Sequence, residues 1–323
     1  MKAIRFAKTG GPEVLGLQDI ALPPPAKGQI RVRHTAIGVN FIDTYHRSGL
    51  YPLPLPSGLG MEAAGSVDAL GAGVSHLKIG DRVGYCTGPV GAYAEANNVP
   101  ADRVVKLPAG VSDDVAAAAM LKGMTAQYLL KRTFPVRRGQ TILFHSAAGG
   151  VGLIAVQWAK HLGAHVIGTV GSDAKIELAK AHGCDQVFNT EKDDWVAGVR
   201  ELTGGAGVAV VYDSVGKDTF TGSLDCLAPR GMMVSFGNSS GPVAAFEPAL
   251  LSAKGSLYLT RPTLMRYTRT TAELQETADD LFAAIASGAV KIAVNQRFAL
   301  GDARAAHEAL HSRKTTGATV LIP

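Results

Sequence analysis

The stretch Gln140-Thr-Ile-Leu-Phe-His-Ser-Ala-Ala-Gly-Gly-Val-Gly-Leu-Ile-Ala-Val-Gln-Trp-Ala-Lys160 decides the fold. An apolar run at 142–144 meets a glycine-rich turn, which opens directly into a segment with helical apolar spacing. This order of strand, tight turn and helix N-terminus is typical of a dinucleotide-binding turn. The N–H groups of the turn and the positive end of the helix dipole would then face a pyrophosphate.

The turn is a variant of the G-x-G-x-x-G spacing. Alanine takes the first of the three glycine positions, and the two remaining glycines let phosphate, helix and strand approach the backbone closely. A glycine turn before a helix is often only a turn, but the strand before it and the alternation after it favour a cofactor site. The residues predicted to bind the cofactor here are Ala147, Ala148, Gly149, Gly150, Val151 and Gly152.

Strands and helices alternate after the turn. Strand-like runs rich in Val and Ile are separated by segments with helical spacing, which predicts an α/β fold with a doubly wound parallel sheet. Ligands of such sheets bind at the carboxyl ends of the strands. The expected strands are 164–170, 186–188, 208–212, 232–236 and 257–259, and the expected helices are 173–182, 192–202 and 218–227.

The end of the second strand indicates which cofactor is bound. NAD sites place a carboxylate there for the ribose hydroxyls, but this strand runs into Gly171 and Ser172, and Asp173 is better placed to begin the next helix. Ser172 can donate to a 2′-phosphate and Lys175 can supply the countercharge. The alternative is that Ser172 caps a helix and Lys175 is a solvated helix residue. We favour NADPH over NADH.

Composition narrows the class of protein. The chain has 323 residues, a net charge of +5 and a pI near 9.1. Its Lys and Arg are spread along the sequence without aromatic interleaving, so nucleic acid is not expected as a partner. No apolar run reaches membrane-spanning length and no targeting segment is evident. Three distant cysteines indicate reduced, buried thiols in a cytoplasmic protein.

The flanks differ from the middle of the chain. Residues 1–122 hold short β-like runs broken by Gly and Pro, which suits an irregular, partly closed β domain. A helix is expected at 116–131, two amphipathic helices at 273–287 and 302–312, and a last strand at 318–322. That strand needs a sheet to join, so we predict a discontinuous catalytic domain of 1–124 and 262–323 with a dinucleotide-binding domain, 125–261, inserted.

Together these features resemble a known family over the whole chain, namely the zeta-crystallin-like quinone oxidoreductase branch of the zinc-independent medium-chain dehydrogenases/reductases, and bacterial NADPH:quinone reductases in particular. The resemblance rests on the order of several motifs rather than on any one of them. Those motifs are Gly38-Val-Asn40-Phe-Ile-Asp43, Arg47-Ser-Gly49-Leu-Tyr51-Pro52, Gly58-Leu-Gly60-Met-Glu62-Ala-Ala-Gly65, Gly80-Asp-Arg-Val83, the turn at 147–152, Tyr212-Asp-Ser-Val-Gly216, Ser235-Phe-Gly-Asn-Ser239 and Leu259-Thr-Arg-Pro262.

The resemblance implies a Rossmann domain and a GroES-like catalytic domain in a homodimer, with the nicotinamide in the interdomain cleft. It implies transfer of reducing equivalents from NADPH to a quinone, with the number of electrons per step left open. Zinc-dependent relatives place a His before the Glu, where this chain has Met61-Glu62, and carry a four-Cys lobe that this chain lacks. We therefore expect no metal.

Several site residues are predicted with this family in view. Quinone oxygens gain charge on reduction and need hydrogen-bond donors, for which Asn40, Tyr45 and Tyr51 are the candidates; the alternatives are a turn-stabilising Asn and packing aromatics. Thr125 matches a position near the nicotinamide, or is only a polar helix residue. The remaining cofactor candidates are Ser214, Phe236, Gly237, Asn238, Arg261 and Arg313. The alternative for each is an ordinary turn residue or, for the arginines, an exposed residue.

Two features count against a simple transfer of properties. Bacterial relatives have a Tyr near the adenosine phosphate where this chain has Thr190, which weakens the NADPH assignment and is more simply a loop residue. His307-Glu-Ala-Leu-His311 matches the zinc-hydrolase motif H-E-x-x-H, but no third ligand follows it, so we interpret it as a coincidence on a surface helix.

Two other functions remain open. The same fold and cofactor serve reduction of an activated C=C bond in an enone or enoyl thioester, and the sequence separates this poorly from quinone reduction. Some eukaryotic relatives suggest a non-enzymatic crystallin-like or RNA-binding role, but no RNA-binding signature is present here. Quinone reduction is the favoured prediction.

Overall fold

The computed structural model describes residues 1–312 and 314–323. The chain folds into two compact units: unit one contains Met1–Met124, Thr268–Ala286 and Ile292–Pro323, and unit two contains Thr125–Tyr267 and Ser287–Lys291. The second unit therefore lies inside the first in sequence. Each unit has its own sheets and its own core.

Local interactions explain where the units divide. This part of unit two ends at Tyr267, later than the predicted boundary at 261/262. The Tyr267 ring stacks on that of Tyr128 with centroids 4.5 Å apart, and the Tyr267 carbonyl accepts a hydrogen bond from Arg132 Nη1 at 2.6 Å. The short return of the chain at Ser287–Lys291 is held by Gln157, which donates to Lys291 O and accepts from Lys291 N, both at 3.0 Å.

Unit two is built on a six-stranded parallel sheet with the strand order β11-β10-β9-β12-β13-β14. The winding direction reverses between β9 and β12, and the carboxyl ends of all six strands lie at one edge. All six predicted strands are confirmed, although the fifth begins earlier than expected and ends before Phe236. The bounds are β9 Thr141–Phe144, β10 His165–Val170, β11 Gln186–Asn189, β12 Val208–Asp213, β13 Leu227–Ser235 and β14 Tyr258–Thr260.

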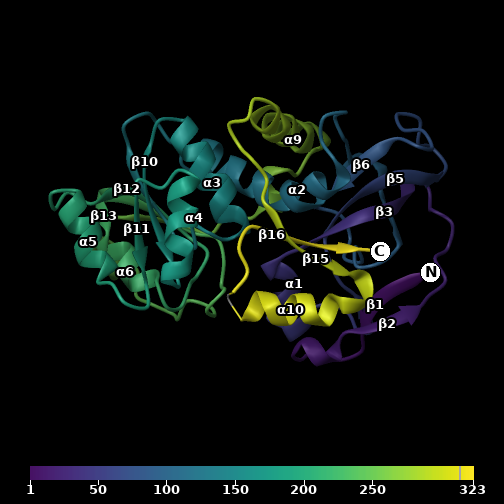
Figure 1. Cartoon of the computed structure of the whole chain (residues 1–323), viewed down its shortest axis with the longest axis horizontal. Helices are drawn as coiled ribbons and strands as arrows, with labels where there is room; N and C mark the ends of the chain where they lie inside the picture. Colours follow the sequence, from purple (N-terminus) through teal and green to yellow (C-terminus); the bar gives the residue numbers. More distant parts are fainter. Residues whose placement is uncertain (313) are drawn as a thin grey trace. The chain divides into compact units, whose positions relative to one another are not determined.

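Helices cover both faces of this sheet (Figure 1). Right-handed crossovers place α3 and α4 on one face and α5 and α6 on the other. The predicted helix at 173–182 is split, because Asp173–Lys175 forms a 3₁₀ turn before α4 begins. The bounds are α3 Gly150–His161, α4 Ile176–Ala181, α5 Trp195–Leu202, α6 Phe220–Asp225, α7 Ala249–Ala253 and α8 Leu264–Tyr267.

Unit one contains a mostly antiparallel sheet in the order β15-β16-β3-β5-β6-β8, with β7 also paired to β3, and a small sheet in the order β2-β1-β4. The bounds are β1 Lys2–Phe6, β2 Gly16–Asp19, β3 Gln29–Val39, β4 Ser57–Gly58, β5 Glu62–Leu70, β6 Arg82–Tyr85, β7 Ala96–Pro100, β8 Val105–Lys106, β15 Val294–Ala299 and β16 Ala318–Ile322. The C-terminal strand β16 joins the sheet of unit one, as predicted, where it pairs antiparallel with β3. Strand β15 was not predicted; its residues alternate between half-buried and exposed, which leaves little apolar signal.

The helices of unit one are α1 Phe41–Ser48, α9 Thr271–Ala286 and α10 Ala303–His311, with α2 Asp113–Tyr128 crossing from unit one into unit two. The helices α2, α9 and α10 follow the predictions closely, whereas α1 was not predicted. Beyond Tyr128 a π-helical turn, Leu129–Thr133, continues the helix past its predicted end. The thiols of Cys86, Cys184 and Cys226 are free and buried, which confirms their prediction as packing residues.

Candidate functional site

The predicted phosphate-binding turn joins β9 to α3. Ser146 takes a left-handed backbone conformation (φ 55°), and its carbonyl accepts from Gly149 N at 2.9 Å. Gly149 caps α3 with its backbone alone, so the first N–H groups of the helix point into the turn. A Cβ at Gly152 would lie closer than 3.0 Å to Ser146 O and to the Ala147 backbone. The glycine is therefore required by backbone packing, and the turn can hold an anion.

The next loop follows β10, the neighbour of β9. Gly171 is exposed with open space where a side chain would stand, and Ser172 sits at the N-cap of the 3₁₀ turn without a side-chain capping bond. Lys175 ends that turn. Asp173 begins it, as predicted, and its carboxylate is bound by Asn189 Nδ2 at 2.6 Å and by Lys192 Nζ. The carboxylate of Asp173, which follows this strand end, is thus already bound within the protein.

Thr190 lies beside the same strand end. Its backbone N donates to Val170 O at 2.9 Å and its hydroxyl donates to the same oxygen at 3.3 Å. Both hydrogen bonds join the end of β11 to the end of β10. They agree with the interpretation of Thr190 as a loop residue rather than as a residue that binds the adenosine phosphate.

The remaining cofactor candidates of unit two gather at the carboxyl ends of β12, β13 and β14. Gly237 leaves no room for a Cβ against Ser214 O. Arg261 donates from Nη1 to Ser235 O at 3.1 Å and from Nη2 to the Asn238 side-chain oxygen at 3.3 Å. A cavity of about 260 Å³ opens here, lined by Phe220, Ser235, Asn238, Pro242, Val243, Phe246, Leu259 and Arg261.

In unit one, the candidate Asn40 belongs to a buried polar cluster. Its Nδ2 donates to Glu62 Oε2 at 2.8 Å and approaches Gly38 O at 3.4 Å. Lys122 Nζ donates to the same Glu62 oxygen at 3.2 Å, and Leu121 N donates to the other at 2.7 Å. Glu62 is fully buried and Lys122 nearly so. Neither Glu62 nor Lys122 was predicted as a functional residue.

Tyr45 on α1 and Tyr51 on the segment after it lie together. Their rings meet edge to face with centroids 5.2 Å apart, and Tyr51 N donates to Tyr45 O at 3.1 Å. Tyr45 is buried and Tyr51 half-buried. Thr125 is buried in α2, at the first residue of unit two. Arg313 lies outside the described residues.

A second buried polar cluster in unit one surrounds His307. Tyr93 Oη donates to Asp43 Oδ2 at 2.9 Å and lies 3.1 Å from His307 Nε2. Arg47 Nη1 lies 2.9 Å from His307 Nδ1, and its Nη2 lies 3.3 Å from His311 Nε2. Arginine only donates, so His307 Nδ1 accepts and its Nε2–H faces Tyr93.

This cluster corrects one prediction. His307 is fully buried, so the H-E-x-x-H pattern is not confined to the surface of its helix. The two histidines share a face of α10, and both contact the Arg47 guanidinium, which is a hydrogen-bond donor. Among residues 1–312 and 314–323, no group of three or more His, Cys, Asp or Glu is arranged to hold a metal ion.

The buried titratable groups predict a pH dependence of stability. Burial lowers the pKa of His34 to about 4 and that of His307 to about 3, and burial raises the pKa of Asp43 to about 7. The histidines therefore contribute stability above pH 6.5 that is lost as pH falls toward 4 and 3. Asp43 contributes stability at low pH that is lost as pH rises through 7.

Between pH 4.5 and 6 these three groups together give one more bound proton in the unfolded state than in the folded state. We expect His307→Gln to lower the slope of unfolding free energy against pH by about 1.4 kcal/mol per pH unit, and Asp43→Asn to raise it by a similar amount. Urea unfolding of both variants and wild type across this range measures the slopes. Parallel slopes for all three proteins would contradict the assignment.

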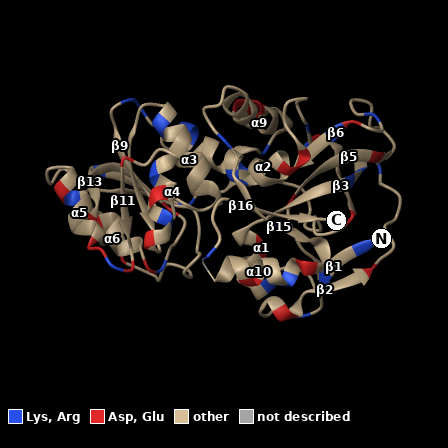
Figure 2. Ribbon diagram, viewed as in Figure 1, with Lys and Arg blue, Asp and Glu red and all other residues tan. Residues whose placement is uncertain are grey.

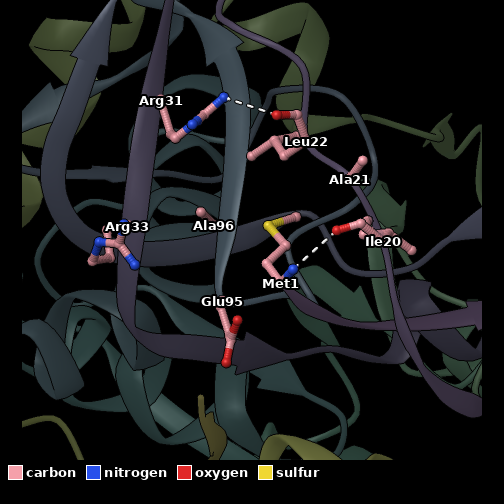
Figure 3. A pocket seen from close by; sticks show the side chains of 8 residues that line it. All are labelled: Met1, Ile20, Ala21, Leu22, Arg31, Arg33, Glu95 and Ala96. Carbon is pink, nitrogen blue, oxygen red and sulfur yellow. Dashed lines mark hydrogen bonds between the residues drawn. The ribbon is translucent and has the colours of Figure 1, made fainter.

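A further hollow, of about 350 Å³, lies in unit one where none of the candidate residues is found (Figure 3). The terminal amine of Met1 donates to Ile20 O at 2.9 Å, and Arg31 donates to Leu22 O at 3.2 Å. Arg33, also in its wall, pairs with Asp68. The charged groups here are engaged within the protein, so this hollow is not part of the candidate site.

Figure 2 shows basic and acidic residues interspersed over both units, without a basic stripe in this view. No helix within the described residues has the length and apolar character needed to cross a membrane.

Comparisons with known proteins agree with this geometry. Residues 26–109 match the family described as alcohol dehydrogenase GroES-like domain, and residues 150–284 match the family described as zinc-binding dehydrogenase. The chain is 55% identical to the quinone oxidoreductase of Pseudomonas aeruginosa, with 100% of this chain and 99% of that protein covered. It is 46% identical to the 2-haloacrylate reductase of a Burkholderia species, with 98% and 97% covered.

A solved structure is similar over its full length. The Escherichia coli quinone oxidoreductase, crystallised in complex with NADPH, superposes with a TM-score of 0.99 at 53% identity, and the alignment covers 100% of both chains. The parallel sheet, its glycine turn and the GroES-like sheet thus occur together in a protein that binds NADPH.

Proposed function

Because this chain belongs to the quinone oxidoreductases of the medium-chain dehydrogenase/reductase superfamily, we propose that it is an NADPH-dependent quinone reductase. The observation that carries the proposal is the strand–turn–helix at 141–161, placed where the winding of a parallel sheet reverses. Full-length identity of 53–55% to bacterial quinone oxidoreductases supports the same activity.

The residues of unit two fit a dinucleotide. The turn at 147–152 would hold the pyrophosphate with backbone N–H groups, because Gly152 brings the start of α3 against Ser146 O without an intervening side chain. Ser214, Gly237, Asn238 and Arg261 lie at the strand ends on the other side of the reversal point. The bound cofactor supplies the hydride; the protein binds and orients it.

We propose that Ser172 and Lys175 select NADPH. Asp173 is held by Lys192 and Asn189, so it does not offer a carboxylate to a ribose hydroxyl. Lys175→Glu is expected to weaken NADPH binding by about tenfold or more, since a countercharge becomes a repulsion, and to leave NADH binding within about threefold. Fluorescence titration with both cofactors measures this. Equal effects on NADPH and NADH would contradict the role of Lys175.

The substrate oxygens would be bound from unit one. Asn40 commits its amide hydrogens to Glu62 and Gly38, so we propose that it orients the start of α1 and that the hydroxyls of Tyr45 and Tyr51 are the donors. A tyrosine hydroxyl can donate a hydrogen bond to an oxygen that gains negative charge. We also propose that Thr125 orients the nicotinamide.

The test of the function is a titration followed by turnover. NADPH is added to the protein while fluorescence is recorded, and 1,4-benzoquinone is then added while absorbance at the nicotinamide band is followed. Binding with quinone-dependent oxidation is the expected result. Absence of binding to either NADPH or NADH would overturn the enzyme assignment.

The 46% identity to a 2-haloacrylate reductase supports a second candidate, reduction of an activated C=C bond. The same assay separates the two functions when 2-chloroacrylate or an enone replaces the quinone. Binding of NADPH with turnover of the alkene alone would favour this second function. We expect kcat/KM to be higher with the quinone.

We also propose that the protein is a cytoplasmic homodimer. Strand β14 is the last of its sheet and Tyr258 on it is 59% exposed, which gives an edge that a second copy can extend. Sedimentation of the purified chain at micromolar concentration tests the oligomeric state.

A further inference from the structure

A chain of buried hydrogen bonds links the ends of three neighbouring strands in unit two. His145 directly follows β9, Thr169 lies in β10 and Asp213 ends β12. His145 Nδ1 lies 2.8 Å from Thr169 Oγ1, and its Nε2 lies 2.9 Å from Ser223 Oγ on α6. Ser223 Oγ donates to Asp213 Oδ2 at 3.0 Å. All four side chains are buried, with at most 1% exposure.

The direction of each bond follows from the partners. The Asp213 carboxylate also accepts from Val215 N at 2.7 Å, Gly216 N at 3.0 Å and Thr219 Oγ1 at 2.7 Å. Since the Ser223 hydrogen goes to Asp213, the Ser223 oxygen accepts from His145 Nε2–H. Burial lowers the pKa of His145, so the ring is neutral and its Nδ1 accepts from the Thr169 hydroxyl.

The hydrogen bonds of Thr169 fix the residues on both sides of Ser146, the non-glycine residue of the turn that has a left-handed backbone. Ser146 has φ 55°, a conformation that costs a non-glycine residue energy and persists only when its surroundings fix it. Both of its neighbours are bound to Thr169: His145 through its ring, and Ala147 through its N–H, which donates to Thr169 O at 2.9 Å. The Ser146 carbonyl in turn accepts from Gly149 N.

We infer that Asp213, Ser223, His145 and Thr169 form a positioning network that holds Ser146 left-handed and thereby sets the affinity of the turn for the pyrophosphate of the cofactor. The inference rests on the proposed function and adds residues to it that do not touch the cofactor. The network keeps the turn in its binding conformation before the ligand arrives, which lowers the ordering cost of binding.

The test is a double-mutant cycle with NADPH as the probe. We expect Ser223→Ala to raise the Kd of NADPH by about tenfold, because it leaves the buried His145 Nε2–H without an acceptor and removes one of the four donors to Asp213. Ser223→Thr keeps the hydroxyl and should stay within about threefold of wild type. In a Ser146→Gly background, Ser223→Ala should change Kd by less than about threefold, since glycine adopts the left-handed conformation without strain.

Thermal unfolding of every variant is measured beside Kd, and Thr169→Val, which replaces the hydroxyl with a methyl group, serves as a second variant if Ser223→Ala does not fold. Should these variants lower Tm while binding NADPH as wild type does, the network is structural only and the inference fails with the proposed function intact. The same tenfold effect in both backgrounds would also overturn it. If wild type itself does not bind NADPH, the proposed function fails first.

Discussion

Gly152→Ala is expected to weaken NADPH binding by about 100-fold. The new Cβ would lie closer than 3.0 Å to Ser146 O and to the Ala147 backbone, and none of these atoms can move as a flexible side-chain end can. Overpacking of this kind costs about 1–3 kcal/mol. Because the strain falls on the turn itself, a loss near 3 kcal/mol appears in the Kd as about two powers of ten.

Two matched alanine variants separate this effect from general destabilisation. Gly110→Ala adds a methyl group in open space and should change neither Tm nor Kd. Gly198→Ala drives its Cβ into the Phe188 ring on the other side of the sheet, so it should lower Tm and leave the Kd of NADPH unchanged below the unfolding temperature. An unaltered Kd in Gly152→Ala would show that the turn at 147–152 does not hold the cofactor.

Local patterns predicted the parts of the site that are continuous in sequence. The turn at 147–152 could be predicted because strand, glycines and helix follow one another within about twenty residues, and the strands of the parallel sheet could be predicted from short apolar runs rich in Val and Ile. Strand β15 gave no such signal, since its residues are only half-buried on one face. The return of 287–291 to unit two depends on Gln157, 134 residues earlier in the chain.

The buried polar groups could not be predicted in the same way. Glu62 meets Lys122 across 60 positions, and His145 meets Ser223 across 78, so no window of sequence contains both partners. His307 is different. The spacing of Ala303, Ala306 and His307 places the histidine on the apolar face of α10, which a helical projection of 303–311 indicates.

Lys122→Met is expected to lower the unfolding free energy by about 3–5 kcal/mol, the largest effect on stability among the predicted variants. The substitution leaves the fully buried Glu62 carboxylate without its only cationic partner among the bonds that the structure describes, and an uncompensated buried charge is costly. Asn40 Nδ2 and Leu121 N still donate to Glu62, but these neutral donors do not replace the ammonium. Urea unfolding at pH 7 measures the loss.

A second substitution tests whether the charge itself is responsible. Glu62→Gln in the Lys122→Met background removes the orphaned charge, and the Asn40 amide can turn to present its oxygen to the new Gln amide. The double variant should therefore be more stable than the sum of the single changes by about 1–3 kcal/mol. Arg304→Met, which breaks an exposed i,i+4 pair with Glu308 on α10, should cost no more than about 0.5 kcal/mol. Additive losses would contradict this assignment, because a charge interaction between Lys122 and Glu62 disappears once both partners are neutral and would make the two changes non-additive.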